Sequence, residues 1–153
     1  MIDLFQALMN VVAENEWPHQ KIDDTTLRLE VIGENGNWPA FAKCLADIEQ
    51  ILFYSIVNNK TPEDRRQALA EFITRANYGL RMGNFELDFS DGEVRFKTSL
   101  HFRAECPPEG MIEQAIYDNA LTMDHYLPGI MRVMFSDTPP LEIITEIEGG
   151  KTT

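Results

Sequence analysis

The 153-residue sequence is poor in cysteine and contains no long apolar run. Its two cysteines, Cys44 and Cys106, form no Cys-x-x-Cys pair and have no histidine at metal-binding spacing. A chain of this length buries enough surface to fold without a disulfide, so we expect two reduced thiols in a cytoplasmic protein. No apolar stretch reaches the roughly 20 residues that span a bilayer, and the N-terminal segment lacks the basic residues of a signal peptide.

Basic residues are also scarce. The chain has 13 Lys and Arg against 25 Asp and Glu, which gives a formal net charge of −12. A field of this sign repels the phosphates of nucleic acids and the head groups of anionic lipids. No cluster of Lys and Arg stands apart from the acids. The composition therefore argues against nucleic acids and membranes as partners.

Motifs for catalysis and metal binding are missing as well. The three histidines, His19, His101 and His125, lie far apart and have no neighbour at the spacing of a zinc motif. Ser55 lacks the Gly-x-Ser-x-Gly context of a nucleophile, and no glycine-rich loop has the spacing of a nucleotide site. The sequence therefore predicts no enzymatic activity, no cofactor and no metal.

Three amphipathic helices are indicated by apolar residues at helical spacing. The first covers residues 2–14 with Asp3 as its N-cap, and the second starts at Thr61 as its N-cap. The third covers residues 109–127, kinks or ends at Pro128-Gly129, and is expected to resume over "IMRVMF" (130–135). From residue 136 the sequence predicts an acidic tail, so we expect one domain over 1–135 and a tail over 136–153.

Five strands are predicted between these helices. The alternating segment "TTLRLEVIG" and the segment "WPAFAKCLA" are expected to form a hairpin with a tight type I′ turn at Asn35-Gly36. The uncharged segment "ILFYSIV" (51–57) is expected to be covered on both faces or to lie centrally in its sheet. The element order α-β-β-β-α-β-β-α predicts an α+β domain.

The last two strands lie in "GNFELDFSDGEVRFKTSLHF" (83–102), where Asp91-Gly92 predicts a two-residue turn. This turn places Phe89 opposite Val94, Leu87 opposite Phe96 and Phe85 opposite Thr98. On the other face, Glu86 is expected to meet Lys97, and Asp88 to meet Arg95. We therefore interpret the acids of this stretch as the solvent side of a hairpin and not as a calcium or acid/base site.

This order of elements and the hairpin motif resemble the YbjN family of small bacterial domains. The motif residues are Asn77, Gly83, Phe85, Asp88, Asp91, Gly92, Val94 and Phe96. The resemblance implies an α+β fold similar to type III secretion chaperones, in which an antiparallel sheet packs on helices. Those chaperones are small, acidic and usually dimeric, and they hold a segment of a client. It also implies a binding role, because the family is described as sensory transduction regulators.

The leading functional hypothesis is a non-enzymatic, homodimeric, chaperone-like or regulatory domain that binds another protein through an apolar surface. An uncharged strand and a methionine-rich helical segment supply more apolar surface than one modest sheet needs. The predicted contact residues are Phe53, Tyr54, Ile56, Met123, Tyr126, Met131 and Met134.

Two alternatives remain. One is a small-molecule sensor or an unrecognised enzyme with a pocket between sheet and helices, in which Asp88, Asp91 and Asp124 or His125 would converge. The other is a scaffold whose tail "PPLEIITEIE" docks elsewhere.

Overall fold

The computed structural model describes residues 3–149, which form a six-stranded antiparallel sheet with helices against one of its faces. Across the sheet the strands follow the order β1-β2-β3-β4-β6-β5. The strands are β1 (His19–Lys21), β2 (Thr26–Ile32), β3 (Asn37–Leu45), β4 (Gln50–Ile56), β5 (Asn84–Leu87) and β6 (Val94–His101). The helices are α1 (Leu4–Glu14), α2 (Arg66–Gly79), α3 (Glu109–Phe135) and α4 (Pro140–Glu148), with 3-10 turns η1 (Ala46–Ile48) and η2 (Glu63–Arg65).

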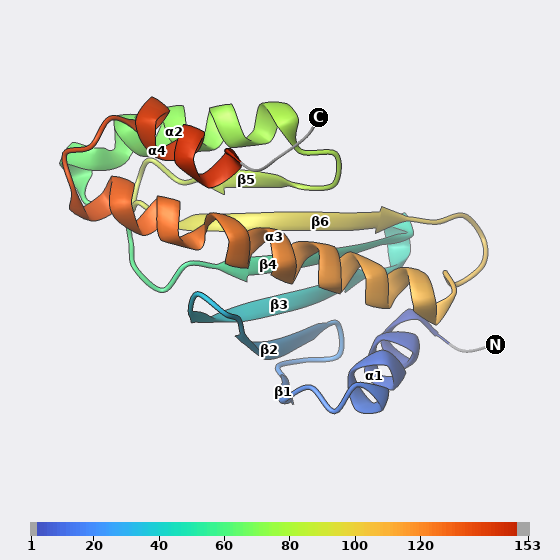
Figure 1. The fold of residues 1–153 in the computed structure, drawn as a ribbon. Helices are drawn as coiled ribbons and strands as arrows, with labels where there is room; N and C mark the ends of the chain where they lie inside the picture. The colour runs from blue at the N-terminus through green and yellow to red at the C-terminus, as the bar shows by residue number, and fades with distance from the viewer. Residues whose placement is uncertain (1–2, 150–153) are drawn as a thin grey trace.

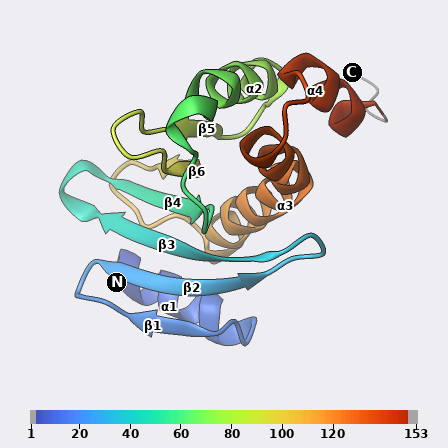
Figure 2. The same cartoon turned by 90° about the vertical axis from the view of Figure 1, so that its left-hand side faces the viewer.

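All four of these α-helices lie on the same side of the sheet (Figures 1 and 2). They bury two apolar cores. The first core lies under α1 and the first half of α3, where Leu8 and Ile112 pack on Phe53 of β4. The second core lies under α2, α4 and the second half of α3, where Phe72 packs near Phe96 of β6. The predicted α+β class with an antiparallel sheet on helices is confirmed.

The uncharged segment predicted as a strand is β4, which lies in the interior of the sheet as expected. Helices cover only one of its faces, so burial alternates along it. Side chains that point toward the helices are buried, whereas those on the other face are half-buried: Leu52, Tyr54 and Ile56. The strand therefore presents apolar side chains on a face of the sheet that no α-helix of the described chain covers.

The β5–β6 hairpin forms where predicted, but its register differs. Leu87 lies opposite Val94 and Phe85 opposite Phe96, so the prediction that Leu87 faces Phe96 is wrong by two residues. A shift of two residues keeps every side chain on its expected face, and Phe85, Val94 and Phe96 are buried. Phe89, predicted to pair with Val94, lies outside the strand and is 50% exposed.

Local hydrogen bonds explain the longer turn. Residues 88–93 form the β5–β6 loop, in which the Asp88 carboxylate accepts hydrogen bonds from the backbone N–H and the hydroxyl of Ser90 (2.8 and 2.5 Å). The Asp91 carboxylate accepts one from the Glu93 N–H (2.9 Å). Aspartate side chains favour such turns, and here they end the strand before the Asp-Gly dipeptide is reached.

The same shift changes the ion pairs on the outer face of the hairpin. Glu86 lies opposite Arg95 and pairs with it at 2.8 Å, and it also reaches Lys97 diagonally at 3.3 Å. The predicted pair between Asp88 and Arg95 is not formed, because Asp88 belongs to the loop. The acids of this stretch therefore belong to a hairpin and its turn, as interpreted from the sequence.

The second helix begins later than predicted. Thr61 is not its N-cap: its hydroxyl makes no hydrogen bond, and α2 starts at Arg66 after the 3-10 turn η2. Instead, the Thr61 N–H donates to the Gly92 carbonyl (2.8 Å), which holds the chain before α2 against the β5–β6 loop. At the first helix the prediction holds, since the Asp3 carboxylate accepts from the Gln6 N–H at 2.7 Å.

Helix α3 neither ends nor breaks at Pro128-Gly129 but runs continuously from Glu109 to Phe135. Gly129 gives room for close packing, since a Cβ there would lie 2.6 Å from the ring of Phe72 and 3.0 Å from Ile147. Helix α4 lies in the segment predicted as an acidic tail, and its Ile143 and Ile144 are buried in the second core. Its apolar stripe is too short to stand out in the sequence. Residues 150–153 of that segment lie outside the described residues.

An edge of the sheet is covered by the side chain of Asn77, near the end of α2. Its amide oxygen accepts from the Phe85 N–H (2.7 Å) and its amide nitrogen donates to the Phe85 carbonyl (3.0 Å). Asn77 therefore satisfies backbone groups of β5 that would otherwise be unpaired at the sheet edge. This contact explains why Asn77 and Phe85 occur together in the hairpin motif.

Candidate functional site

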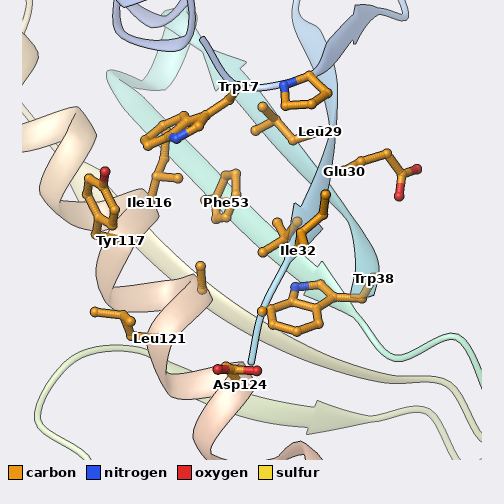
Figure 3. A pocket seen from close by; sticks show the side chains of 14 residues that line it. Trp17, Leu29, Glu30, Ile32, Trp38, Phe53, Ile116, Tyr117, Leu121 and Asp124 are labelled. Carbon is orange, nitrogen blue, oxygen red and sulfur yellow. The ribbon is translucent and has the colours of Figure 1, made fainter. Parts of the chain in front are cut away.

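A cavity of about 360 Å³ lies between α3 and the strands β2, β3 and β4 (Figure 3). We call it the α3 cavity. It is located between the two cores, where Phe53 and Ile116 of the first core approach Trp38 of the second. The lining residues are Trp17, Pro18, Leu29, Glu30, Val31, Ile32, Gly33, Trp38, Phe53, Ile116, Tyr117, Ala120, Leu121 and Asp124.

The mouth of the α3 cavity is apolar. Ile32 is 76% exposed, Leu121 is 64% exposed and Tyr117 is 40% exposed, although all three are large apolar or aromatic residues. Trp17 packs edge-on against Tyr117 with ring centroids 5.3 Å apart. Strand β1 pairs with β2 only as far as Leu29, so the backbone beyond it lies at the edge of the sheet and borders the opening.

Asp124 lies at one end of the cavity, near Trp38 (Figure 3). Its carboxylate holds the loop of residues 33–36, the β2–β3 loop, by accepting from the Glu34 N–H (3.0 Å) and the Asn35 N–H (2.8 Å). The predicted type I′ turn at Asn35-Gly36 is not formed, because Asn35 has no positive φ and Ile32 pairs with Asn37 across a four-residue loop.

A proline makes a further contact of this loop possible. Pro128 has no backbone N–H, so the carbonyl four residues earlier in α3, that of Asp124, loses its helical donor. The side-chain amide of Asn35 donates to this carbonyl at 3.0 Å. Asp124 therefore accepts from the loop through both its carboxylate and its backbone carbonyl, and the carbonyl is available because Pro128 has no N–H.

Gly33 allows the close approach of loop and helix. A Cβ at this position would lie 2.3 Å from the Asp124 carboxylate and 2.9 Å from the ring of Trp38. A larger residue would therefore displace the anchor of the β2–β3 loop and one wall of the cavity together.

The second candidate site is the face of the sheet opposite the helices, which we call the helix-free face. At its centre, the strand pairing places Phe41 beside Tyr54, and Leu52 and Ile56 lie on the same face. All four are half-buried although no α-helix of residues 3–149 covers them. Arg95 stacks on the ring of Tyr54, with its guanidinium carbon 4.3 Å from the ring centroid.

The charges on the helix-free face are mostly basic, in contrast to the rest of the molecule. The pairing places the side chains of Arg28, Lys43, Arg95 and Lys97 on this face, beside two acids. Glu30 pairs with Arg28 at 2.6 Å, and Glu86 pairs with Arg95 and Lys97. The face therefore has an excess of positive charge on a chain whose net charge is −12.

The structure separates the predicted contact residues into three places. Phe53 lines the α3 cavity, whereas Tyr54 and Ile56 lie on the helix-free face. The other four belong to the second core: Met123, Tyr126 and Met134 are buried there, and Met131 packs against it. These four fill the interior and offer little surface to a partner in this conformation. Whether any of the seven binds a protein stays a prediction.

The acids named for the alternative pocket are not brought together. Asp124 lines the α3 cavity and His125 beside it is exposed, while Asp88 and Asp91 belong to the β5–β6 loop. Hydrogen bonds from Ser90 lower the pKa of Asp88, and the contact with Lys60 lowers that of Asp91. A general acid at neutral pH needs the opposite shift. Among residues 3–149, no group of three His, Cys, Asp or Glu could hold a metal ion.

The thiols are similarly unsuited to nucleophilic chemistry. Both Cys44 and Cys106 are free, and burial raises the pKa of Cys44 to about 12. Burial raises the pKa of Cys106 as well. Because of these raised pKa values both sulfurs stay protonated at neutral pH, whereas the thiolate is the reactive form.

No helix in the described part of the chain has the length and apolar character needed to cross a bilayer.

Several residues of the two surfaces were missed from the sequence. Trp17 and Trp38 line the α3 cavity, but their positions in separate segments gave no sign that they meet. Phe41 belongs to the helix-free face. Alternation along "WPAFAKCL" points its side chain to the face of the sheet that is opposite to the face of Trp38 and Ala40. That alternation was a usable signal, because Phe41 is apolar on the face that strands usually leave polar.

A helix-covered sheet with an apolar cavity and an uncovered apolar face defines a small α+β domain with two candidate binding surfaces. Residues 5–116 match the sequence profile of the family YbjN, described as "Putative bacterial sensory transduction regulator". The match covers more than half of the chain, so the chain belongs to the YbjN family.

Solved structures resemble this chain at low sequence identity. The crystal structure of YbjN from E. coli, described as "a putative transcription regulator", has a TM-score of 0.62, 12% identity, and coverage of 84% of this chain and 94% of that chain. The HopA1-SchA chaperone–effector complex has a TM-score of 0.48 at 16% identity, over 78% of this chain and 88% of the other. The ExsC-ExsE complex has 0.47 at 15%, over 80% and 91%. No curated protein sequence matches this chain.

Proposed function

We propose that this chain is a non-enzymatic regulatory domain that binds another protein through the helix-free face of its sheet. The observation that carries the proposal is the cluster of Phe41, Leu52, Tyr54 and Ile56 on a face that no described helix covers. Contiguous exposed apolar surface marks interaction sites, and aromatic and arginine side chains supply much of the binding energy in interfaces. The regulatory description of the family agrees with such a role.

The partner we propose is an acidic segment that carries apolar side chains. The basic residues around the apolar centre, Arg28, Lys43, Arg95 and Lys97, would meet its acids, while the centre would bury its apolar groups. Complementary charge at the border of an interface mainly increases selectivity and the rate of association. Binding should therefore weaken as salt is added.

The experiment compares four variants with the wild type. Immobilised protein captures partners from an extract of its own cells, and each partner is identified, purified and titrated against every variant. We expect Ile56→Asp and Lys43→Glu to weaken the same partner roughly tenfold or more, in line with the loss of an interface anchor or charge. Met111→Asp and Arg75→Glu, matched changes at exposed positions of α3 and α2, should leave it unchanged.

Equal binding by all five proteins, or a wild type that captures no partner, would contradict the proposal. If the affinity for the partner does not fall as salt is added, the proposal that the basic residues meet acids of the partner is contradicted. A nucleic acid as the captured partner would assign the basic face to another class of ligand and overturn the proposal.

The homodimer expected from the sequence is a separate part of the proposal. Two copies that met through the helix-free face would bring like charges together, so we expect a dimer to use another surface. Light scattering after size exclusion should give twice the 17.5 kDa mass of the chain. A mass of one chain at every concentration would contradict it. The free cysteines agree with the cytoplasm as the proposed location.

A further inference from the structure

We propose that the α3 cavity binds a small hydrophobic amine, a molecule with an apolar or aromatic body and one protonated nitrogen. This goes beyond the regulatory role proposed above, because it assigns a second and different ligand to the opposite side of the sheet. The two proposals can fail independently, since the lining of the cavity shares none of the four apolar residues at the centre of the helix-free face.

The volume and walls of the cavity suit a ligand body of this kind. Its volume of about 360 Å³ lies in the range of small-molecule sites. Aromatic rings come from three separate parts of the chain: Trp17 before β1, Trp38 and Phe53 from the sheet, and Tyr117 from α3. Such walls favour a flat or aliphatic group over a strongly hydrated one.

The charges at the cavity select the polar end of the ligand. The described residues that line it include Glu30 and Asp124 but no Lys, Arg or His. The Glu30 side chain lies on the helix-free face and pairs there with Arg28, so Asp124 is the acid whose carboxylate lies at the cavity. An anionic ligand would meet this carboxylate without a compensating cation, which is costly in apolar surroundings.

Asp124 can accept from a ligand without releasing the β2–β3 loop. Each of its carboxylate oxygens accepts one backbone N–H, from Glu34 and Asn35, and each has capacity for another. The neighbouring ring of Trp38 is within 2.9 Å of the position a Cβ of Gly33 would take, so ring and carboxylate lie close together. An ammonium group at this end would therefore meet a carboxylate and an aromatic ring, two groups that attract a cation.

Three probes of nearly equal size separate charge from shape: 4-phenylbutylamine, 4-phenylbutan-1-ol and 5-phenylpentanoate. The chain has only two tryptophans, and both line the cavity, so intrinsic tryptophan fluorescence reports on it directly. We expect the amine to bind roughly twofold to fivefold more tightly than the alcohol, the range of a partly exposed ion pair. The carboxylate should bind most weakly, and binding should raise the melting temperature in the same order.

Two variants test the location. Asp124→Asn removes the charge and keeps one oxygen that can accept from the loop, although its amide nitrogen cannot accept the second N–H. The ratio of the affinities for amine and alcohol should therefore fall to one. Asp118→Asn, a half-buried acid on α3 that does not line the cavity, is the matched control and should change neither. Ala120→Phe fills the cavity and should abolish the fluorescence response to all three probes.

Equal affinity of the wild type for amine and carboxylate would overturn the proposal. So would an amine preference that survives Asp124→Asn, or the absence of a fluorescence change and a thermal shift with every probe. If Ala120→Phe fails to fold, the comparison of amine and alcohol in Asp124→Asn decides the question alone.

Discussion

Two hairpin loops of this domain, β2–β3 and β5–β6, have the same kind of sequence but are held in different ways. Both contain a dipeptide that favours a two-residue turn, Asn35-Gly36 in one and Asp91-Gly92 in the other, and both form longer loops. The β5–β6 loop is shaped by its own side chains, chiefly Asp88. The β2–β3 loop is held by Asp124, which lies 89 residues from Asn35 in the sequence.

This difference decides what each loop can affect. The β5–β6 loop is shaped largely by its own hydrogen bonds, and its contacts with residues 60–66, such as that of Thr61 with Gly92, do not involve the lining of the α3 cavity. The β2–β3 loop takes its shape from α3 and shares Asp124 with the α3 cavity. A change at that loop should therefore be detectable in the cavity, whereas a change at the β5–β6 loop should not.

The largest expected effect comes from Gly92→Ala in the β5–β6 loop. Gly92 has a φ of 84°, and a Cβ there would lie 2.3 Å from the Thr61 carbonyl, a backbone atom that cannot move aside. We expect a loss of about 2–4 kcal/mol in the free energy of unfolding from left-handed strain and overlap together. In urea unfolding this should shift the midpoint clearly, while tryptophan fluorescence of the folded state stays unchanged. A midpoint like that of the wild type would contradict the packing described here.

Gly33→Ala in the β2–β3 loop should lower the free energy of unfolding less than Gly92→Ala does, but it should also change the α3 cavity. The atoms in its way belong to the side chains of Asp124 and Trp38, which can shift. We expect a loss of about 1–2 kcal/mol, which lowers the melting temperature by roughly 2–8 °C in a chain of this size. Unlike Gly92→Ala, it should change the folded-state tryptophan spectrum, because Trp38 is displaced. An unchanged spectrum would break the proposed link between this loop and the cavity.

Removing the acid that holds each loop tests the comparison directly. Asp124→Ala should lose about 1 kcal/mol, typical of hydrogen bonds to a charged group that is partly solvated, and Asp88→Ala less. Hydrogen exchange should then become faster at Glu34 and Asn35 in the first variant and at Ser90 in the second, each without effect on the other loop. Faster exchange in both loops from either change would show that they are coupled.

The smallest effect concerns the ion pairs beneath the β5–β6 loop. Burial alone would raise the pKa of Glu86, but hydrogen bonds and charges of Arg95 and Lys97 outweigh it and lower the pKa below its ordinary 4.5. A lowered pKa stabilises the fold above the unfolded value and loses this contribution as pH falls through the folded value. Glu86→Gln should therefore cost roughly 0.2–1 kcal/mol at pH 7 and almost nothing near pH 2. A deficit that persists at low pH would point to packing instead.

The parts of the fold that were predictable depend on local patterns. Alternation located β2, β5 and β6, a turn signal located β3, and an uncharged run located β4. Apolar stripes located α1, with Asp3 as its cap, and α2. Side-chain direction in the β5–β6 hairpin was right even though its register was not, because a shift of two residues preserves the face. The strand β1 was missed because its three residues are all exposed and carry no pattern.

The parts that failed depend on contacts between distant segments. Nothing near Asn35 in the sequence indicates that Asp124 will hold its loop. Pro128 suggested a helix end, although packing against α2 and α4 carries α3 past it. The apolar residues chosen as a binding surface included four from the second core, because composition cannot distinguish interior packing from an exposed face. The cavity escaped notice for the same reason, since its walls come from five separate segments.

The contact of Asn77 with Phe85 has a consequence for assembly. A sheet with two available edges can add a neighbour at each and grow without limit into a fibre. Here the side chain of Asn77 occupies the backbone groups of Phe85 at one border, so a strand added beside β5 would first have to displace this contact. The two borders of the sheet are therefore unequal, and such inequality favours a pair of molecules over a growing fibre, because a fibre needs both borders.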